Sequence, residues 1–269
     1  MRIRPSRGWI NLNLADVWRY RELVFFLTWR DIQVRYKQTL LGVAWVVLQP
    51  LAATLVFTVV FGNLARMPSD NLPYAVFAMA GLVPWNFFAG AFSRGSLSLV
   101  GSANLISKVY FPRLVIPIAS VLSGGVDLAI ALAVLLGLAA YFGIVPTLAV
   151  VSLAPFLLLA LAAALGVGLW LSALNVQYRD VGYLVPFLSQ LWFYATPVVY
   201  PLSLVPEHWQ TWLGLNPMAT VVQGFRWAVL GQAPPPGGML LVSLAVVAAM
   251  LVSGAFAFRR MEKTFADVV

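Results

Sequence analysis

The sequence contains no cysteine and a single histidine, His208. Without cysteine the chain has no disulfide, thiolate nucleophile or cysteine-ligated metal, and one histidine is too few for a typical zinc site. We therefore expect no metal site. Charge is scarce as well, because Asp, Glu, Lys and Arg make up 10% of the residues and hydrophobic residues 61%. Such a chain cannot cover itself with an ordinary water-soluble surface, and the composition predicts a protein embedded in lipid.

Long hydrophobic runs predict how the chain crosses that lipid. A helix rises about 1.5 Å per residue and needs about twenty apolar residues to cross about 30 Å of hydrocarbon, and runs of this length recur. They do not alternate between apolar and polar residues, which excludes the strands of an outer-membrane barrel. The sequence predicts an all-α membrane protein with six transmembrane helices. Their expected ranges are Leu40–Gly62, Leu72–Phe92, Leu114–Phe142, Leu148–Leu174, Tyr183–Tyr200 and Met239–Phe258.

The basic residues divide unequally between the two sides of this membrane domain, residues 40–258. Fifteen of the seventeen Lys and Arg residues lie on the side of the N-terminus, and only Arg66 and Arg226 lie on the other. Cytoplasmic loops retain positive charge, so both termini of this multi-pass membrane protein are predicted to be cytoplasmic. The net charge of +8 then reflects topology and contact with anionic lipids rather than nucleic-acid binding.

Residues 1–39 form the predicted cytoplasmic N-terminus, with a helix over Asp16–Gln38. Five residues of this helix share one apolar face, namely Trp18, Phe25, Trp29, Ile32 and Tyr36. An apolar stripe beside a basic face is typical of a helix in the membrane interface. Periodicity alone leaves two interpretations open, a plain membrane anchor or a helix whose polar side binds a cytoplasmic partner.

Three other segments lie outside the predicted spans. Residues 94–113 form a basic cytoplasmic loop, and residues 259–269 a cytoplasmic tail. The outer region 201–238 contains an apolar stretch, Met218–Leu230, that is too short to cross the membrane. Pro217 before it and Gly231 after it favour a short re-entrant helix in the outer interface.

No catalytic motif is present. A phosphate-binding loop ends in Gly-Lys-Ser/Thr, but Lys37, Lys108 and Lys263 follow Tyr, Ser and Glu. We therefore expect no enzyme and no cofactor of the chain's own; if the protein serves ATP-driven transport, ATP and Mg are bound by a partner subunit. Gly166 and Gly168 lie inside an apolar span and are best explained by close helix packing.

Asp127 is a charged residue near the middle of the third predicted span. A carboxylate at that depth costs several kcal/mol unless it is paired or faces water. It is either a substrate-path or proton-relay residue, or a carboxyl that is neutral or bonded to Ser120, Ser123 or a neighbouring helix. The second interpretation is favoured because no other span offers a second ionisable group for a relay.

Aromatic residues cluster on two of the predicted spans. At helical spacing they are usually packing residues or interface anchors, but aromatic faces also suit the apolar faces of sugar rings. The candidates for a glycan path are Trp85, Phe87, Phe88 and Phe92 on the second span, and Trp192, Phe193, Tyr194 and Tyr200 on the fifth.

Six stretches, taken in order, are similar to one family: the permease subunits of ABC exporters that move lipid-linked polysaccharides, as in O-antigen and teichoic-acid export. The stretches are Trp29–Gly42 (WRDIQVRYKQTLLG), Leu48–Leu51 (LQPL), Lys108–Pro117 (KVYFPRLVIP), Leu171–Asp180 (LSALNVQYRD), Ala195–Pro201 (ATPVVYP) and Leu215–Met218 (LNPM). The resemblance implies a homodimer with two ATP-binding cassette subunits underneath and a lipid-linked glycan as substrate.

The resemblance also implies roles for particular residues. The segment Asp16–Gln38 corresponds to the interface helix that contacts the ATPase, Gly95–Arg113 to the coupling helix, and Asn175–Gly182 to a nearby turn. The ATPase-coupling residues implied are Trp29, Arg30, Asp31, Arg35, Lys37, Lys108, Tyr110, Arg113, Arg179 and Asp180. Arg30, Arg35 and Lys37 either attract the phosphates of the substrate or hold anionic headgroups.

Two rival functions stay open at this point. A related ABC permease that exports a drug or a small lipid would have the same hydropathy. An ion-coupled carrier would need several polar groups inside the spans, and Asp127 alone is present.

Overall fold

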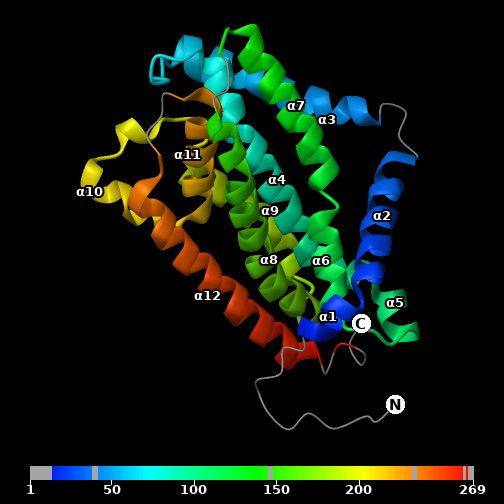
Figure 1. Ribbon diagram of the computed structural model, residues 1–269. Helices are drawn as coiled ribbons and strands as arrows, with labels where there is room; N and C mark the ends of the chain where they lie inside the picture. The colour runs from blue at the N-terminus through cyan, green and yellow to red at the C-terminus, as the bar shows by residue number, and fades with distance from the viewer. Residues whose placement is uncertain (1–13, 38–41, 145–147, 232–234, 263–264, 266–269) are drawn as a thin grey trace.

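The structure, a computed structural model, describes residues 14–37, 42–144, 148–231, 235–262 and 265 (Figure 1). Every regular element in these ranges is helical. In chain order they are α1 (Leu14–Arg19), α2 (Arg21–Lys37), α3 (Val43–Phe57), η1 (Thr58–Leu64), α4 (Tyr74–Gly101), α5 (Ala103–Lys108), α6 (Val115–Leu122), α7 (Gly125–Tyr141), η2 (Leu148–Ser152), α8 (Leu153–Gln177), α9 (Val181–Ala195), η3 (Leu202–Leu204), α10 (Glu207–Gln210), η4 (Trp212–Leu215), α11 (Pro217–Leu230) and α12 (Gly237–Met261).

Helix α4 occupies the centre of the bundle. It packs against α8, α6, α11 and α7, and α8 in turn packs against α12. A helix that is apolar on all sides has no face that favours water, and it is therefore stable when other helices surround it. Val76, Phe88 and Phe92 of α4 are accordingly inaccessible to solvent.

Within the described residues, five helical segments are long and apolar enough to cross a membrane. They are Ala44–Leu64, Tyr74–Gly101, Val115–Tyr141, Leu148–Gln177 and Gly237–Met261. These segments correspond to five of the six predicted spans, and the all-helical membrane architecture is confirmed. The expected start of the first span, Leu40–Leu41, lies outside the described residues.

The remaining predicted span, Tyr183–Tyr200, is shorter than expected. Helix α9 has 15 residues and ends at Ala195, after which the chain turns. Pro197 explains this end, because a proline disfavours helical geometry in the residue before it and has no N–H for the helix ladder. At about 1.5 Å per residue, α9 covers only about 22 Å.

Two segments show detail that the predicted ranges did not contain. Residues 95–101, within the predicted cytoplasmic loop 94–113, are helical and continue α4, and α5 follows them. The third predicted span corresponds to one membrane-length segment, Val115–Tyr141, which bends at Ser123 and Gly124 between α6 and α7. Gly124 and Gly125 lower the helix propensity at this point and place a bend beside Asp127.

The orientation of α3 was not expected. Figure 1 shows α3 and η1 crossing the end of the bundle where α4 begins and α7 ends, rather than lying alongside α4. Trp45, Leu55 and Val59 are exposed in this arrangement. Sequence predicted the length and hydropathy of this segment correctly, but not its direction.

Small residues bring three helices into close contact, as predicted for Gly166 and Gly168. A Cβ added to Gly254 of α12 would lie 2.5 Å from the carbonyl oxygen of Gly166 in α8. Gly168 lies against Gly95 of α4, with 3.7 Å between a Cβ built on Gly168 and the Gly95 backbone. The glycines therefore allow backbone contact between α8 and both of its neighbours, a packing mode common in membrane proteins.

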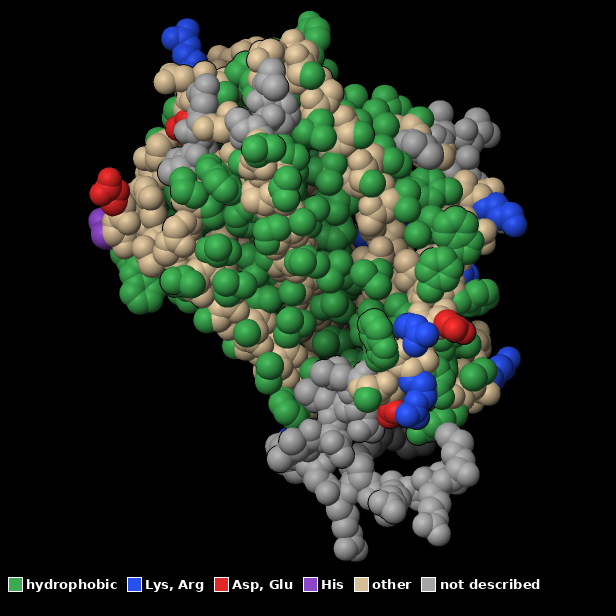
Figure 2. All heavy atoms as spheres, in the orientation of Figure 1, with side chains coloured by type: hydrophobic (Ala, Val, Ile, Leu, Met, Phe, Trp, Pro, Cys, Tyr) green, Lys and Arg blue, Asp and Glu red, His purple; other side chains and the backbone are tan. Residues whose placement is uncertain are grey.

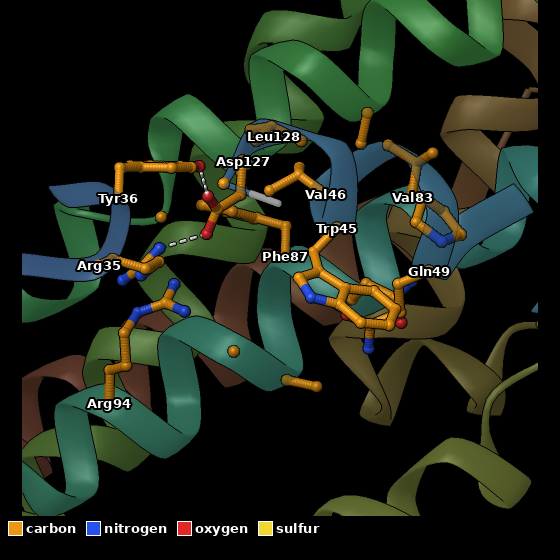
Figure 3. A pocket seen from close by; sticks show the side chains of 17 residues that line it. Arg35, Tyr36, Trp45, Val46, Gln49, Val83, Phe87, Arg94, Asp127 and Leu128 are labelled. Carbon is orange, nitrogen blue, oxygen red and sulfur yellow. Dashed lines mark hydrogen bonds and ion pairs between the residues drawn. The ribbon is translucent and has the colours of Figure 1, made fainter. Parts of the chain in front are cut away.

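Helices α1 and α2 meet at Tyr20, and α2 stands beside α6 (Figure 1). Leu27 is buried against the bundle, whereas Trp18, Phe25 and Trp29 of the predicted apolar stripe are exposed. Exposure of this stripe agrees with a face turned toward lipid or a partner. Tyr36 departs from it, because its hydroxyl points toward α7 (Figure 3).

Apolar side chains cover much of the molecule's outer face (Figure 2). They include Leu158 of α8, Leu184 and Leu191 of α9, and Leu241 and Val252 of α12, all exposed in the single chain. Lipid or another chain must cover such a surface, which agrees with a multi-pass membrane protein.

The predicted short helix of the outer region is present as α11 and begins one residue earlier than expected. Gly231 ends it with a φ of +69°, a left-handed conformation that suits glycine. Almost every residue of α11 is buried, including Arg226. It packs against α4, α8 and α12, and its predicted place in the outer interface stays a prediction. Residues 232–234 of the outer region lie outside the described part.

Candidate functional site: an arginine-lined groove beside the N-terminal helix

Asp127 is bonded to a neighbouring helix, one of the alternatives that the sequence left open. Arg35 forms an ion pair with its carboxylate through Nη1, and the Tyr36 hydroxyl donates a hydrogen bond to its other oxygen (Figure 3). Arg35 Nη2 also donates to Ser123 Oγ at 3.2 Å. These bonds fasten α2 to the bend between α6 and α7.

The bend explains why Asp127 accepts these bonds. Asp127 lies in the first turn of α7, where the free N–H groups and the helix dipole favour a negative charge. Burial, and then the bond to Asp127, raise the pKa of Tyr36 to about 12. The phenol therefore keeps its proton and acts as a donor at physiological pH.

Arg94 enters the same region from α4. Its side chain lies against two glycines. A Cβ added to Gly90 would lie 2.8 Å from Nη1 of Arg94, and a Cβ added to Gly124 would lie 2.1 Å from Nη2, so only glycine leaves room for the guanidinium. Nε donates to the carbonyl oxygen of Ser120 at 3.3 Å. In the described part of the chain, Arg94 makes no other hydrogen bond and no ion pair.

Two cavities adjoin these arginines. A cavity of about 520 Å³ lies between α2, α3, α4 and α7. A second, of about 660 Å³, lies between α2, α4, α5 and the bend before α7. Arg35 and Arg94 line both cavities, so the guanidinium groups stand at their junction.

The predicted ATPase-coupling residues divide between two places: the second half of α2, which runs away from α1 toward α3, and the end of the molecule that carries α5 and the end of α12 (Figure 1). Tyr110 is 90% exposed directly after α5. Lys108, Arg179 and Asp180 are exposed as well, and Arg30 pairs with Asp31 at 2.8 Å. Their role in coupling stays a prediction.

Lys37, also in that set, is exposed at the end of α2. Arg113, another member, connects the coupling segment to the end of the chain. Its side chain donates to the carbonyl oxygen of Glu262, and its backbone N–H donates to the Glu262 carboxylate at 3.3 Å. Phe265 packs on Phe258 and lies 5.9 Å from the Arg113 guanidinium. The rest of the predicted tail, residues 263–264 and 266–269, lies outside the described residues.

The predicted glycan-path aromatics are brought together, largely in the core. The rings of Phe88 and Phe92 stack at 5.9 Å, and Trp192 meets Phe88 edge-on at 4.8 Å. Trp85 packs on Phe193 at 5.5 Å. Phe87 is also buried, Tyr200 is partly buried and Tyr194 is exposed. The core contacts give most of these rings a packing role in this conformation, and a glycan path stays a prediction.

Sequence reasoning missed Arg226. Its guanidinium is buried and donates to the carbonyl oxygens of Val198 at 2.6 Å, Pro197 at 2.8 Å and Tyr200 at 3.2 Å. It also lies 3.6 Å from the centre of the Phe77 ring. The signal available in the sequence was a lone arginine inside an apolar stretch, which needs internal partners.

Asn216 holds the same region from the other side. Its Oδ1 accepts from the Met218 backbone N–H at 3.1 Å, which caps α11, and from Trp192 Nε1 at 2.7 Å. Its Nδ2 donates to Thr196 Oγ1 at 2.9 Å. The stretches ATPVVYP and LNPM are therefore parts of one structural unit.

The fold and these sites define a multi-pass helical membrane protein with an arginine-lined groove near a charged end. Comparison with known proteins gives the family: residues 22–230 match the ABC-2 type transporter family. The chain belongs to this family, in agreement with the predicted permease.

Named relatives support a narrower resemblance. The chain is 32% identical to an O-antigen export system permease of Myxococcus xanthus, over 93% of this chain and 96% of that protein. It is 31% identical to an O-antigen export system permease of Klebsiella pneumoniae, over 76% and 79% of the two chains. A polysialic acid transport protein of Escherichia coli is 26% identical, over 75% and 78%.

Proposed function

We propose that the protein is the membrane subunit of an ATP-driven exporter that moves a lipid-linked polysaccharide across the bacterial cytoplasmic membrane. The observation that carries the proposal is the similarity to an O-antigen export permease along nearly the whole of both chains. The second relative class, named for polysialic acid transport, handles a different glycan, so the shared property is polysaccharide export.

In this proposal two ATP-binding cassette subunits bind the end that carries α1, α5 and the end of α12. Both termini are then cytoplasmic, as the distribution of Lys and Arg predicts. The exposed side chains around α5, Tyr110 above all, are available to a partner. Movement of that partner reaches α12 through the contacts of Arg113 with Glu262.

A homodimer completes the proposed transporter. The described part of the single chain holds two cavities of several hundred cubic ångströms. Exposed apolar side chains on α3, α9 and α12 must be covered by lipid or by another chain, and a second copy would cover part of them. The glycan then passes between the two copies, with α9 as a sixth, short membrane helix.

The test is deletion of the gene in the source bacterium, followed by complementation. We expect the deletion to abolish surface glycan and to leave lipid-linked glycan inside the cell, and the wild-type gene to restore export. Normal surface glycan in the deletion strain would reject polysaccharide as the cargo.

Coupling is tested with two exposed tyrosines. Tyr110→Ala, beside α5, is expected to reduce export and the amount of ATP-binding subunit that co-purifies. Tyr141→Ala is the matched control, because Tyr141 is 83% exposed at the end of α7, away from α5 (Figure 1). Equal effects of the two substitutions would contradict the proposed docking end.

A further inference from the structure

A second apolar cluster lies apart from the main core, at the end of the molecule that carries α5 and the end of α12 (Figure 1). It joins residues of α2, α4, α5, α6, α8 and α12. Ile106 of α5 and Phe111 between α5 and α6 belong to it, and so do Phe258 of α12 and Phe265 beyond that helix. The segment between α5 and α6 and the residues that follow α12 therefore share one core.

The segment that joins α5 to α6 is exposed between two buried residues. Ile106 and Phe111 are buried, whereas Val109 is 54% and Tyr110 90% exposed between them. Residues 109–114 belong to neither helix. Irregular backbone has no regular ladder of hydrogen bonds, so its polar groups must find other partners. The conformation of this segment therefore depends on what lies against it.

Glu262, directly after α12, bonds to this segment through its side chain and its backbone. The backbone N–H of Arg113 donates to Glu262 Oε1 at 3.3 Å, and Arg113 Nη1 donates to the Glu262 carbonyl oxygen. The last carbonyl groups of a helix have no partner inside the helix and carry partial negative charge, so a guanidinium is a favourable cap for them. The other carboxylate oxygen, Oε2, is paired with Arg259 of α12. That ion pair orients the carboxylate that receives the Arg113 N–H.

Phe265 adds an apolar contact to these polar ones. Its ring centre lies 5.9 Å from the guanidinium carbon of Arg113 and 5.4 Å from the ring centre of Phe258, which it meets edge-on. Both phenylalanines are inaccessible to solvent. The side chain of Glu262 is only 14% exposed. Arg113 is thus held by two largely buried residues that come about 150 residues later in the chain.

We propose that Glu262 and Phe265 form a clasp that positions the exposed residues 107–110 for contact with the ATP-binding subunit. They are positioning residues, because they are too buried to meet a partner and act through Arg113 and the core around Phe111. A segment that is held in place before binding loses less conformational entropy when it binds. The inference rests on the proposed function. It gives a role in docking to the end of the chain, which the sequence indicated only as a tail.

The mobility of a spin label tests the clasp without any partner. Ser107→Cys introduces a single cysteine at an exposed position of the segment, and the labelled full chain is placed in phosphatidylcholine nanodiscs. We expect Glu262→Ala and Phe265→Ala to increase the mobility of the label. Phe265→Leu should restore most of the wild-type spectrum, because leucine keeps the apolar contact. Phe156→Ala is the matched control, since it removes a buried phenylalanine from the main core.

Binding of the ATP-binding subunit tests the purpose of the clasp. The subunit that co-purifies with the wild-type chain is titrated into a fixed amount of each permease variant in nanodiscs. The plateau then measures how much permease is folded, and the midpoint measures affinity. We expect Glu262→Ala and Phe265→Ala to shift the midpoint about tenfold without lowering the plateau, because the segment must be ordered at the moment of contact. Glu262→Gln should shift it less, since its amide oxygen still accepts the Arg113 N–H.

The contrary results separate the clasp from the proposed function. Unchanged mobility in Glu262→Ala and Phe265→Ala, or an equal increase in Phe156→Ala, would overturn the clasp. A wild-type midpoint in variants whose label is mobile would show that the held segment does not serve docking, and would overturn it too. In each case the wild-type chain still binds the subunit and the exporter proposal stands. If no ATP-binding subunit co-purifies with the wild-type chain, the proposed function fails, and the clasp's role in docking fails with it.

Discussion

Arg226 holds the turn that follows α9, and Arg226→Met removes that support while keeping an unbranched side chain. The guanidinium donates to the carbonyl oxygens of Pro197, Val198 and Tyr200. Hydrogen bonds from a charged donor are worth about 1.5–3 kcal/mol each. The variant loses three such hydrogen bonds. It also avoids the free-energy cost of desolvating a buried cation, which is several kcal/mol. We expect a net loss of about 3 kcal/mol in the free energy of opening this turn.

The absence of cysteine makes this loss measurable. Val198 is fully buried, so Val198→Cys introduces a single thiol that a maleimide reaches only when the turn opens. Since about 1.4 kcal/mol corresponds to a factor of ten, the labelling rate is expected to rise about 100-fold when Arg226→Met is added. Arg66→Met on the same Val198→Cys background is the control, because Arg66 is exposed.

The labelling result has a clear contrary outcome. A rate that changes less than about threefold, in a protein that still inserts and purifies normally, would mean that the turn is held without Arg226. The hydrogen bonds of Asn216 would then be sufficient to hold α9 against α11.

Two other substitutions test the packing and the groove by thermal unfolding in detergent. Gly254→Ala is expected to destabilise the protein by about 1–3 kcal/mol, because its Cβ would lie 2.5 Å from the Gly166 carbonyl oxygen; Gly137→Ala, with open space around it, should be neutral or stabilising. Asp127→Asn is expected to lose about 1–2 kcal/mol by removing the partner of Arg35, and adding Arg35→Gln should restore part of the loss. A double variant as unstable as the sum of the two single variants would contradict the ion pair.

Helix existence and ends were predictable where the local chemistry is strong. Pro217 and Gly231 correctly bounded α11, because proline suits the first turn of a helix and glycine suits its left-handed cap. The pair Gly166 and Gly168 indicated close packing correctly. The end of α9 at Ala195 was missed, although Pro197 carried the signal, because the hydropathy of the following residues extended the predicted span.

The side chains that contact one another across helices were harder to predict than the helices themselves. Asp127 was recognised as a charge in need of a partner, but Arg35 and Tyr36 lie about ninety residues away in the sequence. The positive-charge pattern placed Arg94 in a loop, whereas it lies in α4 and lines both cavities. Spacing along one helix does not reveal which other helix it meets.

The sequence by itself determined that this is a helical membrane protein, where most of its helices lie and which family it resembles. These properties follow from local hydropathy, charge and motif, all of which are read along the chain. Only the tertiary structure decided which apolar faces are buried, because lipid and protein core are equally apolar and leave the same pattern in a sequence. It also decided that Arg226 is buried and that Arg94 bonds to the Ser120 carbonyl, since both depend on the neighbours that folding brings together.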